Sequence, residues 1–221
     1  MTFSCYELQT PLEITENKHA TLVIENPIFY RNFIMDLLLQ SQNCSSRFTI
    51  SNGNIVLDAS KEVEIITDIF NVSFDSKAIQ NKINQLIFEE FNISDYTLAE
   101  LLNKINEVGA SIVSSLNFEV NYMPISDFNG ILKLLGFYIE TENLSLPEKI
   151  MEYIGFLNLY CGKKLFIILN LKSALTQEEF FEFVKLLRYK KINILLIENQ
   201  KGEIVEENEN VRIIDNDLCE I

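Results

Sequence analysis

The chain has 221 residues, 48% of them hydrophobic, which is enough to bury one sizeable core or one core with an appended smaller unit. Its 18 Lys and Arg against 32 Asp and Glu give a formal net charge of −14, which argues against non-specific nucleic-acid binding unless the cations gather on one surface. There is no run of about 20 apolar residues and no signal-peptide pattern at the N-terminus, so we expect a cytoplasmic protein without a membrane span.

The four cysteines and the single histidine do not predict a metal site. Cys5, Cys44, Cys161 and Cys219 are far apart in the sequence, whereas a zinc site needs closely spaced ligands. We therefore expect reduced, partly buried thiols. His19 is expected in a polar loop before a strand, where its neighbours offer no catalytic partner.

The N-terminal residues 1–25 are expected to be β-structure, with a first strand over 3–8 and a second over 20–25. Asn26-Pro27 then predicts a helix start, because Asn caps a helix well and the missing N–H of Pro costs nothing at the first helical position. This helix should end near Gln40.

A hairpin is expected next, because Asn52-Gly53 tolerates the positive φ angles of a tight turn between two short strands, 47–51 and 54–58.

Residues 59–116 change in character to successive helices, with helices expected over 61–70 and 76–91 and a longer one capped by Ser94-Asp95. In the longest helix apolar residues recur at alternating spacings of four and three, as in the seam of a coiled coil, although such a seam is more often plain core packing than a groove: Leu98, Leu102, Ile105, Gly109, Ile112 and Leu116. A helical unit of this kind is a natural place for subunit contacts.

Residues 117–145 form a connector in which 118–122 could be extended and Ser126-Asp127 caps a helix running to about Phe137. Leu144 to Glu148 opens another helix, which Gly162 should end in the left-handed conformation.

A strand–helix–strand unit near the C-terminus is the clearest element of the sequence. Two continuous apolar runs, 163–170 and 192–197, are typical of strands buried on both faces. Between them Thr176 and Glu179 form a capping box at the start of an amphipathic helix. Two strands joined by one helix should lie parallel, and a final strand is expected at 211–214.

The predicted fold is therefore α/β: a head domain with a mostly parallel sheet, formed by residues 1–58 and 117–221, with an inserted helical leg at 59–116. Neither G-x-x-x-x-G-K-[ST] nor G-x-G-x-x-G occurs, so no phosphate-binding loop and no bound nucleotide are expected.

No pattern indicates an enzyme. The acidic pairs Glu89-Glu90, Glu178-Glu179 and Glu206-Glu207 are typical of solvated faces, caps or loops, and no G-x-S-x-G elbow occurs. The lysines are dispersed, and only a symmetric oligomer could bring such scattered cations together around a shared axis.

Several segments, taken in order, resemble the CRISPR-associated spacer-acquisition accessory proteins of type II-A systems. They are 20–25, 65–70, 131–136 leading to Ile139-Glu140, 163–170, 194–198 and the short C-terminal strand. The resemblance covers nearly the whole chain and rests on segment order, length and the missing phosphate loop rather than on a sharp motif.

This resemblance implies a non-catalytic protein whose head resembles a P-loop nucleoside-triphosphatase fold without its nucleotide loop. It also implies a homotetrameric ring that encircles double-stranded DNA, loads at free ends and works with the CRISPR integrase complex and effector nuclease in spacer acquisition. Lys133 best matches a residue of the positively charged hole, and Lys104, Lys149 and Arg31 are further DNA-binding candidates from their place on helices.

The resemblance further implies a Ca²⁺ site with acidic ligands just before residue 131. Glu119 fits as a ligand, but Asn121, Met123 and Pro124 stand where acids are expected, and calcium needs about six to eight oxygen ligands. Calcium binding is therefore in doubt at this position.

Two alternatives remain open from the sequence. The acidic charge would also suit a protein-interaction scaffold, a degenerate ATPase-like subunit that recruits partners without touching DNA. An enzyme with an unrecognised site is the other.

Overall fold

The computed structural model describes residues 1–90, 95–202 and 208–221. Contacts divide the chain into two compact units: an α/β unit of residues 1–73 and 141–221, and a helical unit of residues 74–140. No helix in the described ranges is long and apolar enough to cross a membrane.

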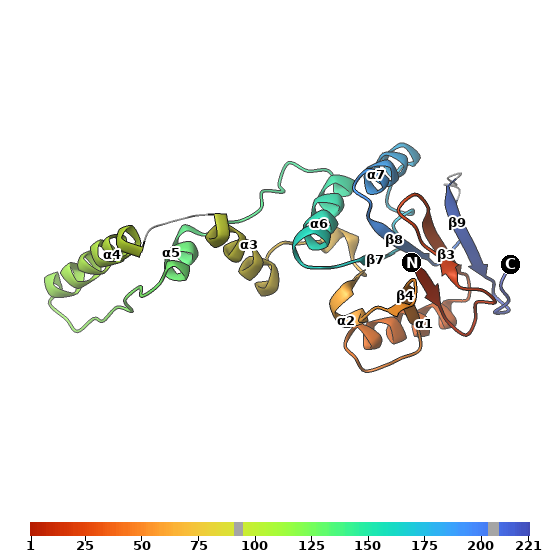
Figure 1. Ribbon diagram of the computed structural model, residues 1–221, viewed down its shortest axis with the longest axis horizontal. Helices are drawn as coiled ribbons and strands as arrows, with labels where there is room; N and C mark the ends of the chain where they lie inside the picture. The colour runs from red at the N-terminus through yellow and green to blue at the C-terminus, as the bar shows by residue number, and fades with distance from the viewer. Residues whose placement is uncertain (91–94, 203–207) are drawn as a thin grey trace. The chain divides into compact units, whose positions relative to one another are not determined.

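A five-stranded sheet forms the centre of the α/β unit (Figure 1). Its strands are β3 (His19–Ile24), β6 (Val63–Ile66), β7 (Leu165–Leu169), β8 (Asn193–Glu198) and β9 (Glu209–Ile214), in the order β6-β7-β8-β3-β9. Every neighbouring pair is parallel, so the predicted parallel α/β sheet is confirmed. Strands β3 and β7 are buried along their whole length, as expected when helices cover both faces of a sheet.

One face of this sheet packs against α1 (Pro27–Ser41) and a small antiparallel sheet. That second sheet has the order β2-β1-β4-β5, with β1 (Thr2–Ser4), β2 (Leu12–Glu13), β4 (Thr49–Asn52) and β5 (Ile55–Val56). Phe3, Phe33 and Phe48 pack on one another in the shared core, with ring centroids 4.7 to 6.2 Å apart. The predicted hairpin is confirmed: β4 pairs with β5, and Gly53 in the turn has φ +59°.

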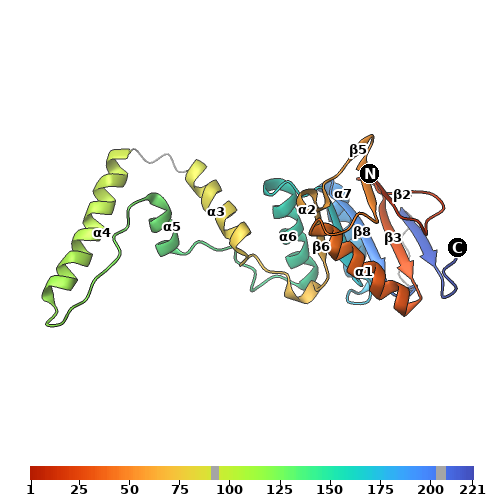
Figure 2. The same ribbon diagram turned by 90° about the horizontal axis from the view of Figure 1, so that it is seen from below.

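The opposite face is covered by α6 (Leu146–Tyr160) and α7 (Gln177–Tyr189), which Figures 1 and 2 show side by side. Their apolar residues Ile150, Ile154, Phe180 and Phe183 are buried. The predicted caps are confirmed, because both helices begin with a capping box, and Gly162 after α6 has φ +72°.

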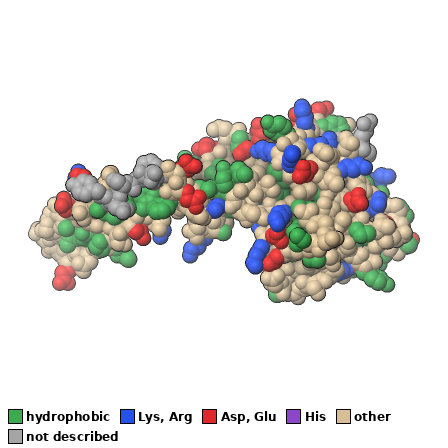
Figure 3. All heavy atoms as spheres, in the orientation of Figure 1, with side chains coloured by type: hydrophobic (Ala, Val, Ile, Leu, Met, Phe, Trp, Pro, Cys, Tyr) green, Lys and Arg blue, Asp and Glu red, His purple; other side chains and the backbone are tan. Residues whose placement is uncertain are grey.

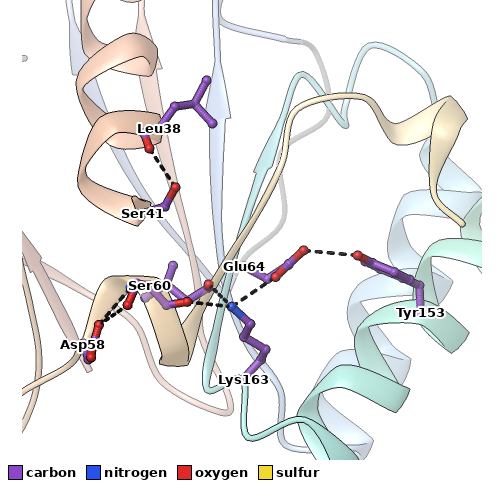
Figure 4. A network of polar contacts seen from close by, with 8 residues as sticks. Leu38, Ser41, Asp58, Ser60, Glu64, Tyr153 and Lys163 are labelled. Atoms are coloured by element: carbon purple, nitrogen blue, oxygen red, sulfur yellow. Dashed lines mark hydrogen bonds and ion pairs between the residues drawn. The ribbon is translucent and has the colours of Figure 1, made fainter. Parts of the chain in front are cut away.

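A polar network joins the amino ends of β6 and β7 to α2 (Ala59–Glu62) and α6 (Figure 4). Lys163 Nζ lies 3.2 Å from Glu64 Oε2 and donates to the carbonyl of Val63 at 2.7 Å. Tyr153 Oη donates to the other oxygen of Glu64 at 3.1 Å. These partly buried groups have partners on different elements, and the bond between Tyr153 and Glu64 ties α6 to the edge strand β6.

The helical unit contains α3 (Lys77–Glu90), α4 (Asp95–Ser115) and α5 (Phe128–Leu135). Its core is small: Phe128, Ile131 and Leu132 of α5 are buried against half-buried residues of the other two helices, among them Leu98, Leu102 and Ile105. The later positions of the expected seam, Ile112 and Leu116, are exposed, so the coiled-coil spacing is buried only over its first half.

Several boundaries differ from the expectations. Residues 61–70 were expected to be a helix, but they contain the end of α2, strand β6 and the start of the short 3-10 helix η1 (Ile69–Asn71). The pattern Val-Glu-Ile-Ile suits either element, and pairing with β7 decides for a strand. The helical unit accordingly begins at residue 74 rather than 59 and extends to 140.

The expected strand over 3–8 is also shorter, since β1 ends at Ser4, and 118–122 contains no strand. The expected cap residue Ser94 and the pair Glu206-Glu207 lie outside the described residues.

Candidate nucleic-acid interface

The four cations expected to bind DNA lie on four different helices. Arg31 is exposed on α1 and Lys149 is half-buried on α6, both in the α/β unit, whereas Lys104 and Lys133 are exposed on α4 and α5 of the helical unit. Lys104 Nζ is 2.9 Å from Glu100 Oε1, so its charge is partly neutralised within its own helix. On the face of the α/β unit in Figure 3, Lys and Arg side chains alternate with Asp and Glu.

A groove of about 850 Å³ surrounds Lys133 in the helical unit. Its lining is rich in neutral hydrogen-bonding side chains, namely Asn81, Asn84, Gln85, Ser126 and Asn129. Among the described lining residues Asp127 alone carries a carboxylate, and it caps α5 by accepting from the amide of Gly130 at 2.9 Å. Lysine, asparagine and glutamine donate well to phosphate oxygens, so this groove could bind a nucleic-acid backbone.

The fold of α5 explains why Lys133 faces outward. Phe128, Ile131 and Leu132 form the buried stripe of the helix, and position 133, which follows them, lies off this stripe and is exposed. Gly136 ends the helix in the left-handed conformation with φ +64°, as its sequence position suggests.

Asn106 of α4 holds the lining segment of this groove around Ile125. The sequence analysis did not identify Asn106 as a functional residue. Its side chain donates to the carbonyl of Ile125 at 2.8 Å and accepts from the amide of Ile125 at 2.9 Å. A two-bond amide clamp of this kind fixes an irregular segment that has no strand partner. Nothing in the sequence distinguishes Asn106 from the other asparagines, because its partner lies 19 residues away.

The residues around Glu119 do not fit a calcium ion. Glu119 is exposed, and within the described ranges no three side chains of His, Cys, Asp or Glu are grouped so that they could hold a metal. A single carboxylate falls far short of the oxygen ligands that calcium requires.

A second polar site lies in the α/β unit, on the face of β3 and β9 that is turned toward α7. Glu209 Oε1 accepts from Thr21 Oγ1, and it lies 2.5 Å from Lys172 Nζ and 3.5 Å from His19 Nε2. His19 was expected in a polar loop, but it is the first residue of β3 and only 4% exposed. Pairing with β9 extends the strand by this residue and buries it.

The carboxylates of this site have pKa values shifted in opposite directions. Burial raises the pKa of Glu198 to about 7, and the nearby charge of Glu209 adds to the effect. The pKa of Glu209 is lowered to about 2, because its hydrogen bonds with His19, Lys172 and Thr21 outweigh burial, which acts the other way. Sequence reasoning missed this site, although Lys172 and Glu198 follow or end neighbouring parallel strands, where polar residues often converge.

The start of α1 leaves no room for a phosphate loop. Strand β3 ends at Ile24 and α1 begins at Pro27. Asn26 Oδ1 accepts from the amides of Ile28 and Phe29, and Pro27 has no N–H. The groups that would bind a phosphate at this helix terminus are therefore absent or already bonded.

A comparison with models of protein families identifies the family of this chain. The family model described as "CRISPR-associated protein (Cas_Csn2)" matches residues 40–218. The chain belongs to the Csn2 family.

Two members of the Csn2 family show how far the similarity extends. The CRISPR-associated protein Csn2 of Streptococcus agalactiae is 24% identical over 147 residues, which are 63% of this chain and 64% of that protein. The CRISPR-associated protein Csn2 of Enterococcus faecalis is 25% identical over 159 residues, which are 66% of this chain and 70% of that protein. The match thus spans just under two thirds of the length of the first of these Csn2 proteins.

Proposed function

We propose that this chain is a non-catalytic protein that binds the ends of double-stranded DNA as a homotetrameric ring during spacer acquisition in a type II-A CRISPR system. Membership of the Csn2 family carries the proposal, because it implies a role in CRISPR adaptation. The partners would be DNA ends, the integrase complex and the effector nuclease, in the cytoplasm.

Symmetry would reconcile DNA binding with an overall charge of −14. Four copies around one axis would repeat each exposed cation four times, so that Lys133, Lys104, Lys149 and Arg31 need not cluster within one chain. The groove beside Lys133 supports this role, because neutral amides there add phosphate donors without adding carboxylates. The exposed apolar side chains of α4, including Val108 and Ile112, would suit subunit contacts.

The head would be a nucleoside-triphosphatase-like fold that no longer binds nucleotide. The parallel sheet with helices on both faces supports that resemblance. The two-residue connection between β3 and α1, with its self-capped helix start, supports the loss of nucleotide binding. Affinity for DNA would then come from phosphate contacts, and retention on the duplex from the closed ring. Calcium has no part in this proposal.

The test compares linear with covalently closed circular duplex of the same sequence, in gel-shift titrations at several salt concentrations. End loading predicts binding to the linear form, loss of binding as salt rises, and little binding to the circle. Light scattering on the same sample should give the mass of four chains. Equal binding to both DNA forms, or a stable monomer, would contradict the proposal.

A scaffold that recruits proteins without touching DNA is the second candidate. The net charge of −14 favours it, since an anionic surface repels a polyanion. An intact tetramer that binds neither DNA form even at low salt would decide for this alternative.

A further inference from the structure

The groove beside Lys133 is lined by hydrogen-bonding side chains from two helices of the helical unit. Asn81, Asn84 and Phe88 lie at positions i, i+3 and i+7 of α3, so they share one face of that helix. On α5, Asn129 and Lys133 are one helical turn apart and both line the groove. Asn81 and Asn129 are exposed and Asn84 is half-buried, so a ligand in the groove can reach their amides.

An aromatic ring with an accessible face lies among these amides. Phe88 is 58% exposed, yet its ring packs on the buried ring of Phe128, with centroids 5.7 Å apart and planes inclined by 53°. Met123, Pro124 and Ile125 complete the apolar part of the lining. An exposed ring that is supported on one side by the core is a stacking platform for a flat ligand.

The connector segment 123–127 in the lining is held in place before any ligand binds. Besides the two bonds between Asn106 and Ile125, Tyr122 Oη donates to the carbonyl of Asn106 at 2.8 Å. Gly130 lets the segment approach α5 closely, because a Cβ at position 130 would lie 2.4 Å from Cγ2 of Ile125. A groove formed in advance avoids part of the entropic cost of ordering its side chains around a ligand.

The chemistry of the lining favours a neutral group that has both donors and acceptors. The charged side chains among the described lining residues are Lys133 and Asp127, so their charges balance. A duplex backbone offers only negatively charged acceptors and would use only the donors of the amides. Each side-chain amide has a donor and an acceptor, which match the edge of a nucleobase, and an aromatic face matches its plane. Gln85 contributes less, because its amide is already bonded to Lys82 and Glu89.

We propose that this groove binds unpaired nucleotides at the end of a DNA duplex, with a base stacked on Phe88, its edge bonded to the amides of the groove and an adjoining phosphate at Lys133. The bases of an intact duplex are paired and stacked inside it, so only an overhang or a frayed end can supply such a base. The inference rests on the proposed function, since it takes DNA ends as the ligand, and it adds which part of the end the groove receives.

Three linear duplexes of the same sequence test the inference by fluorescence anisotropy at one salt concentration. One is blunt, one has four unpaired deoxyadenosines at each end, and one has four abasic nucleotides in their place; the overhangs are prepared as 3′ and as 5′ extensions. Adenosine and abasic overhangs carry the same phosphates and differ only in the bases. We expect the adenosine overhang of at least one polarity to bind about tenfold tighter than its abasic counterpart, the effect of stacking one base on an aromatic side chain.

The same series separates failure of the inference from failure of the proposed function. Blunt duplex that binds, together with equal affinities of adenosine and abasic ends in both polarities, would overturn the inference and leave the proposed function standing. A chain that binds none of the linear duplexes would contradict the proposed function, and the inference with it.

Phe88→Leu removes the aromatic face but keeps an apolar side chain against Phe128. The advantage of the adenosine end over the abasic end should then fall at least about fivefold, while the affinity for the abasic end stays as in the parent. Phe118→Leu is the matched control, because Phe118 is 66% exposed in the same unit and lies outside the described lining. A folded Phe88→Leu protein with the full preference for adenosine would overturn the inference. If circular dichroism shows that this variant does not fold, the series on the unmodified chain decides.

Methyl resonances locate the base on the unmodified chain. When the adenosine-ended duplex replaces the abasic one, the ring current of adenine should shift the methyl signals of Met123 and Ile125, which line the groove. Those of Ile194 in β8, a strand of the α/β unit, should stay unchanged. Shifts confined to methyl groups outside the groove would overturn the inference.

Discussion

Lys172 Nζ lies 2.5 Å from Glu209 Oε1, although the two side chains belong to segments separated by two strands of the sheet. Lys172 follows β7 and Glu209 begins β9, with β8 and β3 between them. Both side chains are more than nine-tenths buried. The pair therefore ties the edge strand β9 to the connection that leads into α7.

Removing only the cation of this pair should be more harmful than removing both charges. Lys172→Met leaves the carboxylate of Glu209 buried without its partner, and we expect the free energy of unfolding to fall by about 3–5 kcal/mol. The double variant Lys172→Met/Glu209→Gln should lose clearly less, because no unpaired charge remains. Urea denaturation measures both, with the exposed Lys185→Met as control. Additive losses would show that the two residues do not interact.

Stability should depend on pH through Glu198, which faces Lys172 and Glu209 and also interacts with Tyr30 of α1. Its pKa is raised from 4.5 to about 7, so between these values the folded chain holds a proton that the unfolded chain releases. The free energy of unfolding should therefore fall as pH rises from about 4.5 to 7, by roughly 3 kcal/mol for this group.

Glu209 acts in the opposite direction and at lower pH. With its pKa lowered to about 2, its contribution to stability is present above 4.5 and is lost as pH falls toward 2. Denaturation curves are measured at a series of pH values. In Glu198→Gln the free energy of unfolding should no longer decline between pH 4.5 and 7, but it should still fall as pH drops toward 2. A variant whose profile above pH 4.5 matches the parent would contradict the assignment to Glu198.

Arg47 should stabilise the junction between α1 and the antiparallel sheet. Its guanidinium bridges Glu7 and Asp36 and lies 5.5 to 5.7 Å from the ring centres of Phe29, Phe33 and Phe48. Arg47→Met should lower the free energy of unfolding by about 2–3 kcal/mol, because two half-buried carboxylates lose their partner.

Arg47→Lys is the matched variant for this site, since it keeps the charge but cannot form the fork between two carboxylates. Its loss, measured by the same thermal or chemical denaturation, should be intermediate. A lysine variant as stable as the parent would mean that charge alone matters here.

Charge reversal at Lys133 tests the groove in the helical unit. Because Lys133 is exposed and its neighbours in α5 carry the packing, Lys133→Glu should weaken binding to linear duplex at least about tenfold while the unfolding transition stays unchanged. Lys185→Glu on α7, exposed and paired with Glu182, is the matched control. Affinity equal to the parent would remove Lys133 from the DNA-binding surface.

Local patterns determined most of the secondary structure of this protein. The caps at Asn26, Ser145 and Thr176, the Asn52-Gly53 turn and the continuous apolar strands depend on residues a few positions apart, so the sequence by itself predicted them. The parallel sheet followed from two such strands joined by one helix. The order and residue pattern of these segments were also enough to indicate the family to which the chain belongs.

Tertiary contacts decided what lies between distant residues. Residues 63–66 became a strand because the edge of β7 was available for pairing. His19, Lys172 and Glu209 are up to 190 positions apart, and only the parallel order β7-β8-β3-β9 brings their side chains together on one face. That arrangement buries Glu198 and Glu209 and brings up the charges that shift their pKa values. No local sequence pattern could therefore have predicted the site.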